Sequence, residues 1–256
     1  MKTLTAALLL ATLSFASCTE SSNTLVPSNT KRGPIYFLAG TWVNNNLSAT
    51  FQVSKTVTHI DSASGTQMNA EVDLWDTVDL VPVSGGSVTM NGTALSLINM
   101  TSYGGGKYYQ LSSALGQTVP FSYSGGQLIF SATGSSSFAA LADTFAYVNK
   151  DMNITSPSIY SPAISKSAGF TLTWGYNSGS TDTIMVNVYD DSSGGIIRMC
   201  SDNGSTTFTS TDLASFKTGE LHISVSRMSY KYATDGSGRQ YVMAAYTDEV
   251  IYGSLY

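Results

Sequence analysis

Apolar and polar residues alternate along most of the chain from about residue 35 onward, and this period of two is the feature that most constrains the fold. In residues 70–80 every even position is apolar except Asp76, and residues 170–174 and 184–189 repeat the alternation. Successive side chains of a β-strand point to opposite faces. Each of these segments is therefore predicted to be a strand with one face in a hydrophobic core.

Short turn signals separate the predicted strands. Ser-Gly-Gly occurs at residues 84–86, 124–126 and 193–195, and glycine supplies the positive φ that tight hairpin turns need. Helix-like spacing of apolar residues is confined to residues 138–148 and to a short turn at residues 211–216. We therefore expect antiparallel strands and an all-β fold, built as sandwiches or a barrel.

The composition agrees with exposed strand faces. The 256 residues include 39 Ser and 30 Thr, but only 11% are charged, against about 25% in average globular domains. Threonine suits the exposed face of a strand, because its branched Cβ favours extended backbone while its hydroxyl stays solvated. Collagen is excluded by the lack of a glycine period, coiled coil by the lack of heptads, and disorder by 42% hydrophobic residues.

The chain length favours two domains. A sandwich of immunoglobulin size needs about 100 residues, and the polar segment at residues 150–157 ends in a proline just before a new set of strands. We expect one β-sandwich domain at residues 35–152 and a second at residues 153–256. A single sandwich or barrel of about 220 residues is the alternative.

The second half resembles the immunoglobulin/fibronectin-like modules of exported bacterial proteins. The segments that carry this resemblance are residues 154–157, 164–167, 170–174 and 186–189, followed by Cys200 and by residues 208–213 and 217–227. In order of segments, the first half is similar to the domain that precedes such modules in uncharacterised exported bacterial lipoproteins. The resemblance implies two immunoglobulin-like β-sandwich domains in an exported protein, and it carries no established activity.

The N-terminus predicts export and a lipid anchor. Lys2 precedes an apolar run at residues 4–13 that is too short to span a bilayer, as in a signal peptide. Residues 15–18 (Phe-Ala-Ser-Cys) resemble a bacterial lipobox, which implies a signal peptide at residues 1–17, acylation of Cys18 and a Ser/Thr/Asn-rich tether at residues 18–34. The alternative is an ordinary signal peptide cleaved near Ala16 or Ser17.

The cysteine count separates these two N-terminal states. Cys18 and Cys200 are the only cysteines of the chain. If Cys18 carries a lipid, Cys200 has no intramolecular partner. If Cys18 keeps its thiol, a bridge between Cys18 and Cys200 becomes possible in an oxidising compartment.

The charge distribution argues against a nucleic-acid partner. The chain has 12 Lys and Arg against 17 Asp and Glu. It has no run of basic residues that could replace the counterions of a nucleic-acid backbone. The expected partners are a membrane, reached through the lipid, and a protein or glycan. The expected location is the bacterial cell envelope, at the outer membrane or the cell surface.

The sequence contains few residues in patterns that are typical of catalytic or metal sites. His59 and His222 lie in strand-like segments without the short-range spacing of a zinc site, and His222 is expected to face solvent. No Gly-x-Ser-x-Gly elbow is present, and Cys200 is expected to end a strand. We therefore predict no catalytic residue, no metal and no cofactor.

Acidic residues give two weaker candidates. Glu71, Asp73 and Asp79 share the face opposite the predicted core, with Asp76 on the apolar face, and are expected to form a solvated face. Facing carboxylates would instead indicate a glycoside hydrolase. Loop residues that could bind calcium are Asp182, Asp190, Asp191, Asp202, Asn203 and Asp235, although Asx-Gly pairs are also ordinary turn residues.

The best binding candidate is aromatic. The apolar phase of residues 221–225 switches at Met228, which predicts a bulge near Arg227 or a strand that leaves the core. Tyr230 and Tyr232 would then stand on an outer face, with Arg227 and Lys231 nearby, as a surface for a protein or a sugar. The alternative is that both tyrosines rim the sandwich core.

These observations together predict a non-enzymatic cell-envelope lipoprotein that acts as a surface structural or adhesion-type module. A glycan-binding module is the second hypothesis, and a hydrolase is the third.

Overall fold

The structure, a computed structural model, describes residues 47–60, 62–74, 82–100, 106–113, 126–147, 151–175, 182–190 and 194–256. The predicted signal peptide, Cys18 and the tether lie outside these ranges, as do Asp76, Asp79 and Asp191. Within the described ranges, no helix has the length and apolar character needed to cross a membrane.

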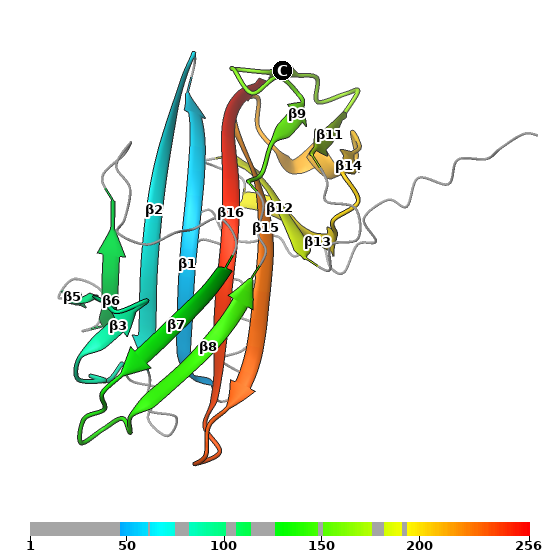
Figure 1. The fold of residues 1–256 in the computed structure, drawn as a ribbon. Coiled ribbons are helices and arrows are strands. Elements are labelled where there is room, and N and C mark those ends of the chain that lie inside the picture. The colour runs from blue at the N-terminus through cyan, green and yellow to red at the C-terminus, as the bar shows by residue number, and fades with distance from the viewer. Residues whose placement is uncertain are drawn as a thin grey trace, which may run out of the picture.

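One large sheet organises the described part of the chain (Figure 1). It has nine strands in the order β13-β12-β15-β16-β1-β2-β6-β5, with β10 beside β16. These strands are β1 (Leu47–Ile60), β2 (Ala63–Leu74), β5 (Ser96–Met100), β6 (Gly106–Ser112), β10 (Ala163–Ile164), β12 (Thr183–Asp190), β13 (Gly194–Ser201), β15 (Gly219–Thr234) and β16 (Gln240–Leu255).

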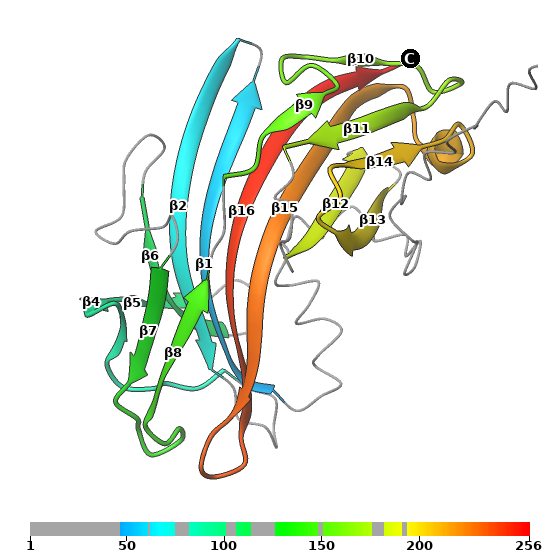
Figure 2. The same ribbon diagram turned by 45° about the vertical axis from the view of Figure 1, so that its right-hand side comes forward.

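Two smaller sheets lie at opposite ends of the large sheet (Figure 2). The four-stranded sheet has the order β4-β3-β7-β8 and contains β3 (Val88–Met90), β4 (Thr93–Ala94), β7 (Gly126–Ala132) and β8 (Leu141–Tyr147). The three-stranded sheet has the order β14-β11-β9 and contains β9 (Ile154–Ser156), β11 (Phe170–Trp174) and β14 (Ser205–Phe208). A short 3-10 helix, η2 (Asp212–Ser215), follows β14.

Each smaller sheet covers its own hydrophobic core. Phe130 on β7 and Phe145 on β8 pack in the first core, and Leu172 on β11 and Phe208 on β14 pack in the second. On β16 the odd-numbered Tyr241, Met243 and Ala245 belong to the first core, and Ile251 and Leu255 belong to the second. Residues of one parity share one face of a strand. Both cores therefore lie on the same side of the large sheet, here called the inner face; the opposite side is the outer face.

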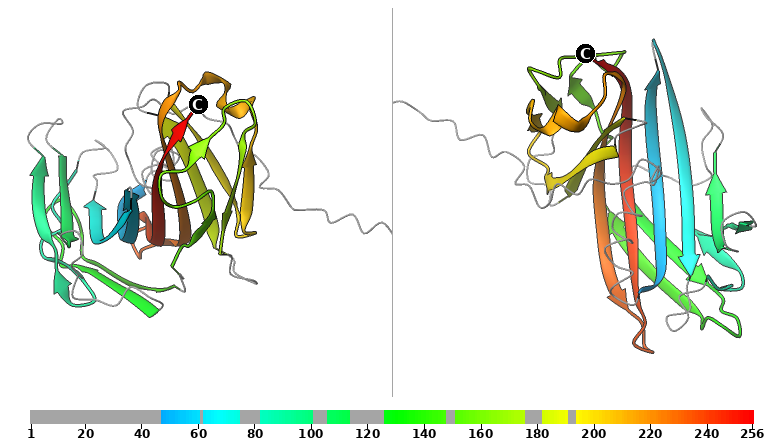
Figure 3. Two further views of the ribbon diagram at one scale, coloured as in Figure 1. Left: turned by 90° about the horizontal axis from the view of Figure 1, so that it is seen from above. Right: turned by 180° about the vertical axis from the view of Figure 1, so that it is seen from behind.

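The two long strands make this arrangement possible. β15 and β16 have 16 residues each and pair in register from one end to the other. At about 3.3 Å per residue, such strands span about 50 Å, enough for two cores placed side by side. Figure 3 shows the smaller sheets from above and the long strands from behind.

The all-β prediction is confirmed, but two self-contained sandwiches are not observed. β1 and β2, from the first half of the chain, join the sheet of the second half through a parallel pairing of β1 with β16. The prediction of antiparallel strands is therefore wrong for the β1–β16 pair and for the β10–β16 pair, which are parallel. The helix-like spacing at residues 138–148 was also misleading, because residues 141–147 form β8.

Candidate functional site

The predicted aromatic pair stands on the outer face near the end of β15. Tyr230 is 40% exposed and Tyr232 is 50% exposed. Their ring centroids lie 5.7 Å apart with an interplanar angle of 87°, an edge-to-face arrangement. Desolvation, reinforced by the neighbouring Tyr230, raises the pKa of Tyr232 to about 12. The Tyr232 phenol therefore stays neutral at physiological pH, and both rings present apolar surface with a polar tip.

Arg227 does not belong to this surface, and that part of the prediction is wrong. The β15–β16 pairing continues from Gly219 to Thr234 without a register shift, so no bulge changes the phase. Arg227 consequently keeps the inner-face parity of Leu221 and Val225, and it is 1% exposed. The apparent phase switch arises because a buried arginine occupies an inner position while Met228 packs on the outer face.

The buried arginine forms an ion pair with Asp202. Arg227 Nε donates to Asp202 Oδ2 over 2.9 Å, and Trp174 Nε1 donates to Asp202 Oδ1 over 2.9 Å. Arg227 also donates to the backbone carbonyls of Gly175 (2.6 Å) and Asp151 (3.1 Å). The pair thus ties β15 to residues that flank the three-stranded sheet.

A second buried pair lies between the two cores. On the inner face of β16, Glu249 comes between Ala245 of the first core and Ile251 of the second. Its Oε1 lies 2.7 Å from His59 Nε2, and its Oε2 accepts a hydrogen bond from the backbone N–H of Ile154 (2.5 Å). We call Arg227, Asp202, Trp174, His59 and Glu249 the polar belt.

The sequence predicts that the acidic residues of β2 form a solvated face, and this prediction is wrong for Glu71. Glu71 is 7% exposed and its Oε1 accepts a hydrogen bond from Gln52 Nε2 (2.9 Å). Asp73 Oδ2 accepts from Thr50 Oγ1 (3.1 Å). Desolvation, followed by the charge of Glu71, raises the pKa of Asp73 to about 7. Both carboxylates lie on one strand, so they do not face each other across a cleft as glycosidase acids do.

Further polar groups continue along the outer face. Desolvation raises the pKa of Asp248 to about 6, although Ser226 donates a hydrogen bond to its Oδ1 (2.8 Å). Desolvation and the charges of Glu71 and Asp73 raise the pKa of Tyr108. The outer face therefore holds two carboxyl groups, Asp73 and Asp248, whose pKa values are raised by desolvation.

His222 is buried instead of facing solvent. It points to the outer face, as its phase predicted, but it is 6% exposed. Its ring stacks on Tyr189 with centroids 4.6 Å apart and meets Tyr252 edge-on, while Nε2 lies 3.0 Å from Glu220 Oε1. The surrounding aromatic rings account for its burial.

The calcium candidates in loops serve as internal hydrogen-bond acceptors. Asp182 Oδ1 accepts from Ser229 Oγ (2.7 Å) and Asp190 Oδ2 accepts from the backbone N–H of Lys217 (2.9 Å). Asp202 belongs to the polar belt. Each of these carboxylates thus has a hydrogen-bond donor within the fold.

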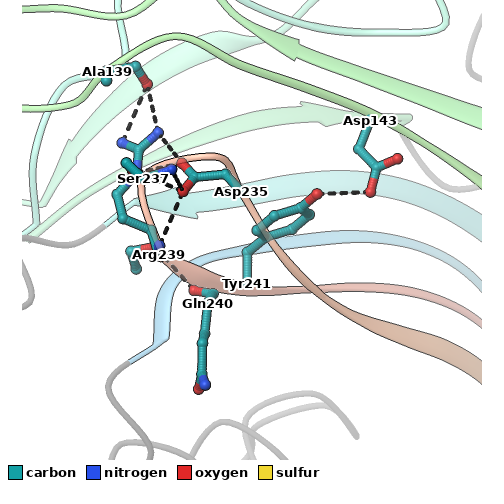
Figure 4. A network of polar contacts seen from close by, with 8 residues as sticks. Ala139, Asp143, Asp235, Ser237, Arg239, Gln240 and Tyr241 are labelled. Carbon is teal, nitrogen blue, oxygen red and sulfur yellow. Dashed lines mark hydrogen bonds and ion pairs between the residues drawn. The ribbon is translucent and has the colours of Figure 1, made fainter.

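The tip of the β15–β16 hairpin is fixed by a polar network (Figure 4). Asp235 accepts hydrogen bonds from the backbone N–H groups of Ser237 and Arg239, and the Arg239 guanidinium reaches the carbonyl of Ala139. Tyr241 Oη donates to Asp143 Oδ2 on β8 over 2.7 Å. Lys231 on β15 contacts the same carboxylate at 3.0 Å. These contacts attach the four-stranded sheet to the long hairpin.

Cys200 on β13 packs against the second core and is disulfide-bonded. The other cysteine of the chain is Cys18, which lies outside the described residues. A disulfide at Cys200 is compatible with the alternative in which Cys18 is not acylated, and not with acylation of Cys18.

The fold and these clusters define an all-β protein with two cores on a shared sheet and an exposed aromatic pair. No known family model matches the chain, and no curated protein is detectably similar to it. Among the described residues, no group of three or more His, Cys, Asp or Glu side chains could hold a metal ion.

Sequence reasoning found Tyr230 and Tyr232 but missed the pairing of Arg227 with Asp202. The sequence does contain one indication of a buried arginine, because Arg227 occupies a position whose alternation with its neighbours is otherwise that of core residues. Its partner is 25 residues earlier in the chain, at a distance that no local pattern encodes.

Proposed function

We propose that the protein is a non-enzymatic structural or adhesion-type module of the bacterial cell surface, and that Tyr230 and Tyr232 contact its partner. The observation that carries this proposal is the exposure of both rings, 40% and 50%, on the outer face of one strand. Tyrosines supply large contact area at low conformational cost, and they are enriched where binding energy concentrates in interfaces.

The orientation of the two rings favours a protein partner. A flat polysaccharide chain stacks best on aromatic rings that lie in one plane, whereas these rings are nearly perpendicular at 87°. An irregular protein surface can pack against the face of one ring and the edge of the other. A glycan-binding module is the second candidate, with one ring stacked on a single sugar.

The module also needs a connection to the cell. A lipid on Cys18 would supply it, and the anchor belongs to this proposal for the acylated chain, in which Cys200 would carry a free thiol in place of the disulfide that the structure has. A thioether at Cys18 and a disulfide between Cys18 and Cys200 exclude each other, because one sulfur cannot make both bonds. Mass spectrometry of the mature chain, before and after reduction, distinguishes an acylated chain from an oxidised one.

An immunoglobulin-like character of each half is likewise a proposal. Its support is that each half of the chain supplies a smaller sheet and a separate core.

The test replaces both tyrosines. We expect Tyr230→Ala/Tyr232→Ala to weaken the binding of protein-coated beads to intact bacterial cells by on the order of tenfold or more. The thermal midpoint should change little, because exposed side chains contribute little to stability. The same beads are applied to immobilised polysaccharides, where selective retention would favour the glycan-binding candidate.

Tyr256→Ala is the matched control, since Tyr256 is 67% exposed at the other end of the large sheet. It should leave binding unchanged. Equal binding by the double variant and the native protein would remove the aromatic pair from the proposal.

A further inference from the structure

A third side chain extends the buried pair of His59 and Glu249 to the surface. Ser64 Oγ lies 2.6 Å from His59 Nδ1, and His59 Nε2 lies 2.7 Å from Glu249 Oε1. Ser64 is exposed, whereas His59 and Glu249 are only 6% and 4% exposed. A hydroxyl, an imidazole and a carboxylate thus form one line of hydrogen bonds from the solvent into the fold. We call Ser64, His59 and Glu249 the serine triad.

The register of three strands places the triad on the inner face. His59 on β1 lies directly opposite Ser64 on β2, so the two side chains share one face of the sheet. On the other side of β1, the partner of His59 on β16 is Ile251, and Glu249 precedes it by two residues. Residues two apart point to the same face of a strand. The imidazole is therefore held between its two partners by backbone pairing on both sides.

Glu249 determines which nitrogen of the imidazole faces Ser64 without a proton. Burial raises the pKa of Glu249, but hydrogen bonds with the Ile154 N–H and with His59 oppose that rise. A carboxylate only accepts hydrogen bonds, so its contact with Nε2 places the ring proton on that nitrogen. His59 Nδ1 is then left as an acceptor for the Ser64 hydroxyl. This is the arrangement in which a histidine activates a serine nucleophile.

The Ser64 side of the triad is open to a reagent. Within the described ranges, β6 pairs with β2 only at Asn69–Val72, so no described strand covers β2 at Ser64 on the side away from β1. An open strand edge presents backbone N–H groups, which can donate to an oxyanion that forms at Ser64. Tyr160 is 45% exposed, and its ring meets that of His59 edge-on with the centroids 5.9 Å apart. Apolar surface for an acyl chain therefore lies beside the imidazole.

We propose that Ser64 is a modification site whose hydroxyl takes an acyl group from an activated ester. Ser64 Oγ attacks the carbonyl carbon and forms a new C–O bond, while its proton passes to His59 Nδ1. The C–O bond to the leaving group then breaks, and the leaving oxygen departs with the electron pair and receives the proton from His59. Glu249 is a positioning residue that also stabilises the imidazolium. The products are an ester of Ser64 and a free alcohol.

The ester of Ser64 is expected to be long-lived. Its hydrolysis would need His59 to activate a water molecule, but the His59 ring is 6% exposed and its Nδ1 faces Ser64 itself. An acyl group on Ser64 Oγ would cover that side of the ring. The modification is therefore stoichiometric, without turnover. It goes beyond the proposed function, which assigns no chemistry to this end of β1 and β2.

The experiment treats the full chain with p-nitrophenyl acetate. We expect the release of one equivalent of p-nitrophenolate per chain, the gain of one acetyl group in the mass spectrum, and its location on the peptide that contains Ser64. His59→Gln should slow the release by about 10²-fold or more, because general-base catalysis contributes about 10²–10⁴-fold. Ser64→Ala should abolish it.

Ser237 provides the matched control. It is also an exposed serine next to a carboxylate, but its hydroxyl donates to Asp235 Oδ1 over 2.7 Å instead of contacting an imidazole. The peptide that contains Ser237 should stay unlabelled while Ser64 reacts. Ser237→Ala should release p-nitrophenolate at the native rate.

Glu249→Gln tests the positioning role. The Gln amide can donate to Nε2, which moves the ring proton to Nδ1 and removes the acceptor for Ser64, so the release should slow. The native chain should show a downfield imidazole N–H resonance in its ¹H NMR spectrum, which Ser64→Ala keeps and Glu249→Gln loses. Since Ser64 is exposed, Ser64→Ala should fold even if the two variants of buried residues do not, and its labelling and resonance still decide the proposal.

Three results would overturn the proposal. Labelling of Ser64 no faster than that of Ser237 would mean that the hydroxyl is not activated. An equal rate in a folded His59→Gln variant would remove the imidazole from the reaction. Continued release of many equivalents of p-nitrophenolate would show turnover, and the triad would then be a hydrolase site instead of a modification site. The binding of protein-coated beads through Tyr230 and Tyr232 is measured separately and does not depend on these results.

Discussion

The polar belt on the inner face and the two carboxylates of β2 on the outer face, Glu71 and Asp73, are both withdrawn from solvent, yet the donors beside them differ. In the polar belt, Asp202 has Arg227 and Trp174 as donors, and Glu249 has His59 and a backbone N–H. On the outer face, Gln52 donates to Glu71 and Thr50 donates to Asp73, and the charge of Glu71 adds to desolvation in raising the pKa of Asp73.

This difference teaches that burial alone does not decide how a carboxylate acts in the fold, because the neighbouring charges decide it as well. A matched group joins parts of the fold, as the polar belt does between two cores.

The largest effect is expected from breaking the polar belt. Arg227→Met leaves the buried carboxylate of Asp202 without its guanidinium partner, so it should lower the free energy of unfolding by about 3–5 kcal/mol. The measurement is the urea midpoint at neutral pH, with the slope of the transition compared between variants.

The companion variant is Arg227→Met/Asp202→Leu, which removes the orphaned charge as well. It should recover much of the loss, because a buried ion pair can be replaced by apolar groups at little net cost. A loss below about 1 kcal/mol in Arg227→Met would show that the pair is not desolvated, and the contrast with the carboxylates of β2 would fail.

A smaller effect, with a defined pH dependence, is expected at Asp73. The folded protein raises the pKa of this carboxyl from 3.8 to about 7. Between these values the unfolded chain loses a proton that the folded chain retains, so stability falls as the pH rises from about 4 to about 7. Asp73→Asn should reduce that fall by about 2 kcal/mol, because Asn does not titrate. Urea denaturation at several pH values in a chelating buffer measures it.

Asp212 provides a control for the sign of the pH dependence of stability. Burial opposes ionisation there, but hydrogen bonds from Thr209 and Arg198 lower its pKa. Its contribution is present above the unfolded pKa and is lost as the pH falls, which is the reverse of Asp73. If Asp73→Asn leaves the pH profile unchanged, Asp73 is ionised in the folded state, and the contrast with the polar belt fails.

The sequence predicted the class of fold well, because the period of two depends on local residues only. It predicted the outer-face position of Tyr230 and Tyr232 for the same reason. It did not predict that β1 pairs with β16, since the partners Phe51 and Met243 lie 192 residues apart. Nothing in either segment encodes that neighbour.

Burial of polar residues was the second limit. Alternation assigned Glu71 and His222 correctly to the face opposite the core, but it assumed that this face was solvated. Their exposed fractions of 7% and 6% show otherwise. A binary pattern states which side a residue takes, and it does not state whether that side is covered.

The smallest effect is expected at the ion pair of Lys55 and Asp151, which also joins β1 to the start of the second half. Lys55 Nζ lies 2.7 Å from Asp151 Oδ2, a distance shorter than that of the Arg227–Asp202 pair. The Asp151 side chain is nevertheless 60% exposed, whereas that of Asp202 is 0% exposed. Asp151→Asn should therefore cost less than about 1 kcal/mol, and 1 M NaCl should reduce this cost further through screening. Urea midpoints at low and high salt measure it. A cost comparable to that of Arg227→Met would mean that proximity of charges, and not their burial, sets the strength of the junction between the two cores.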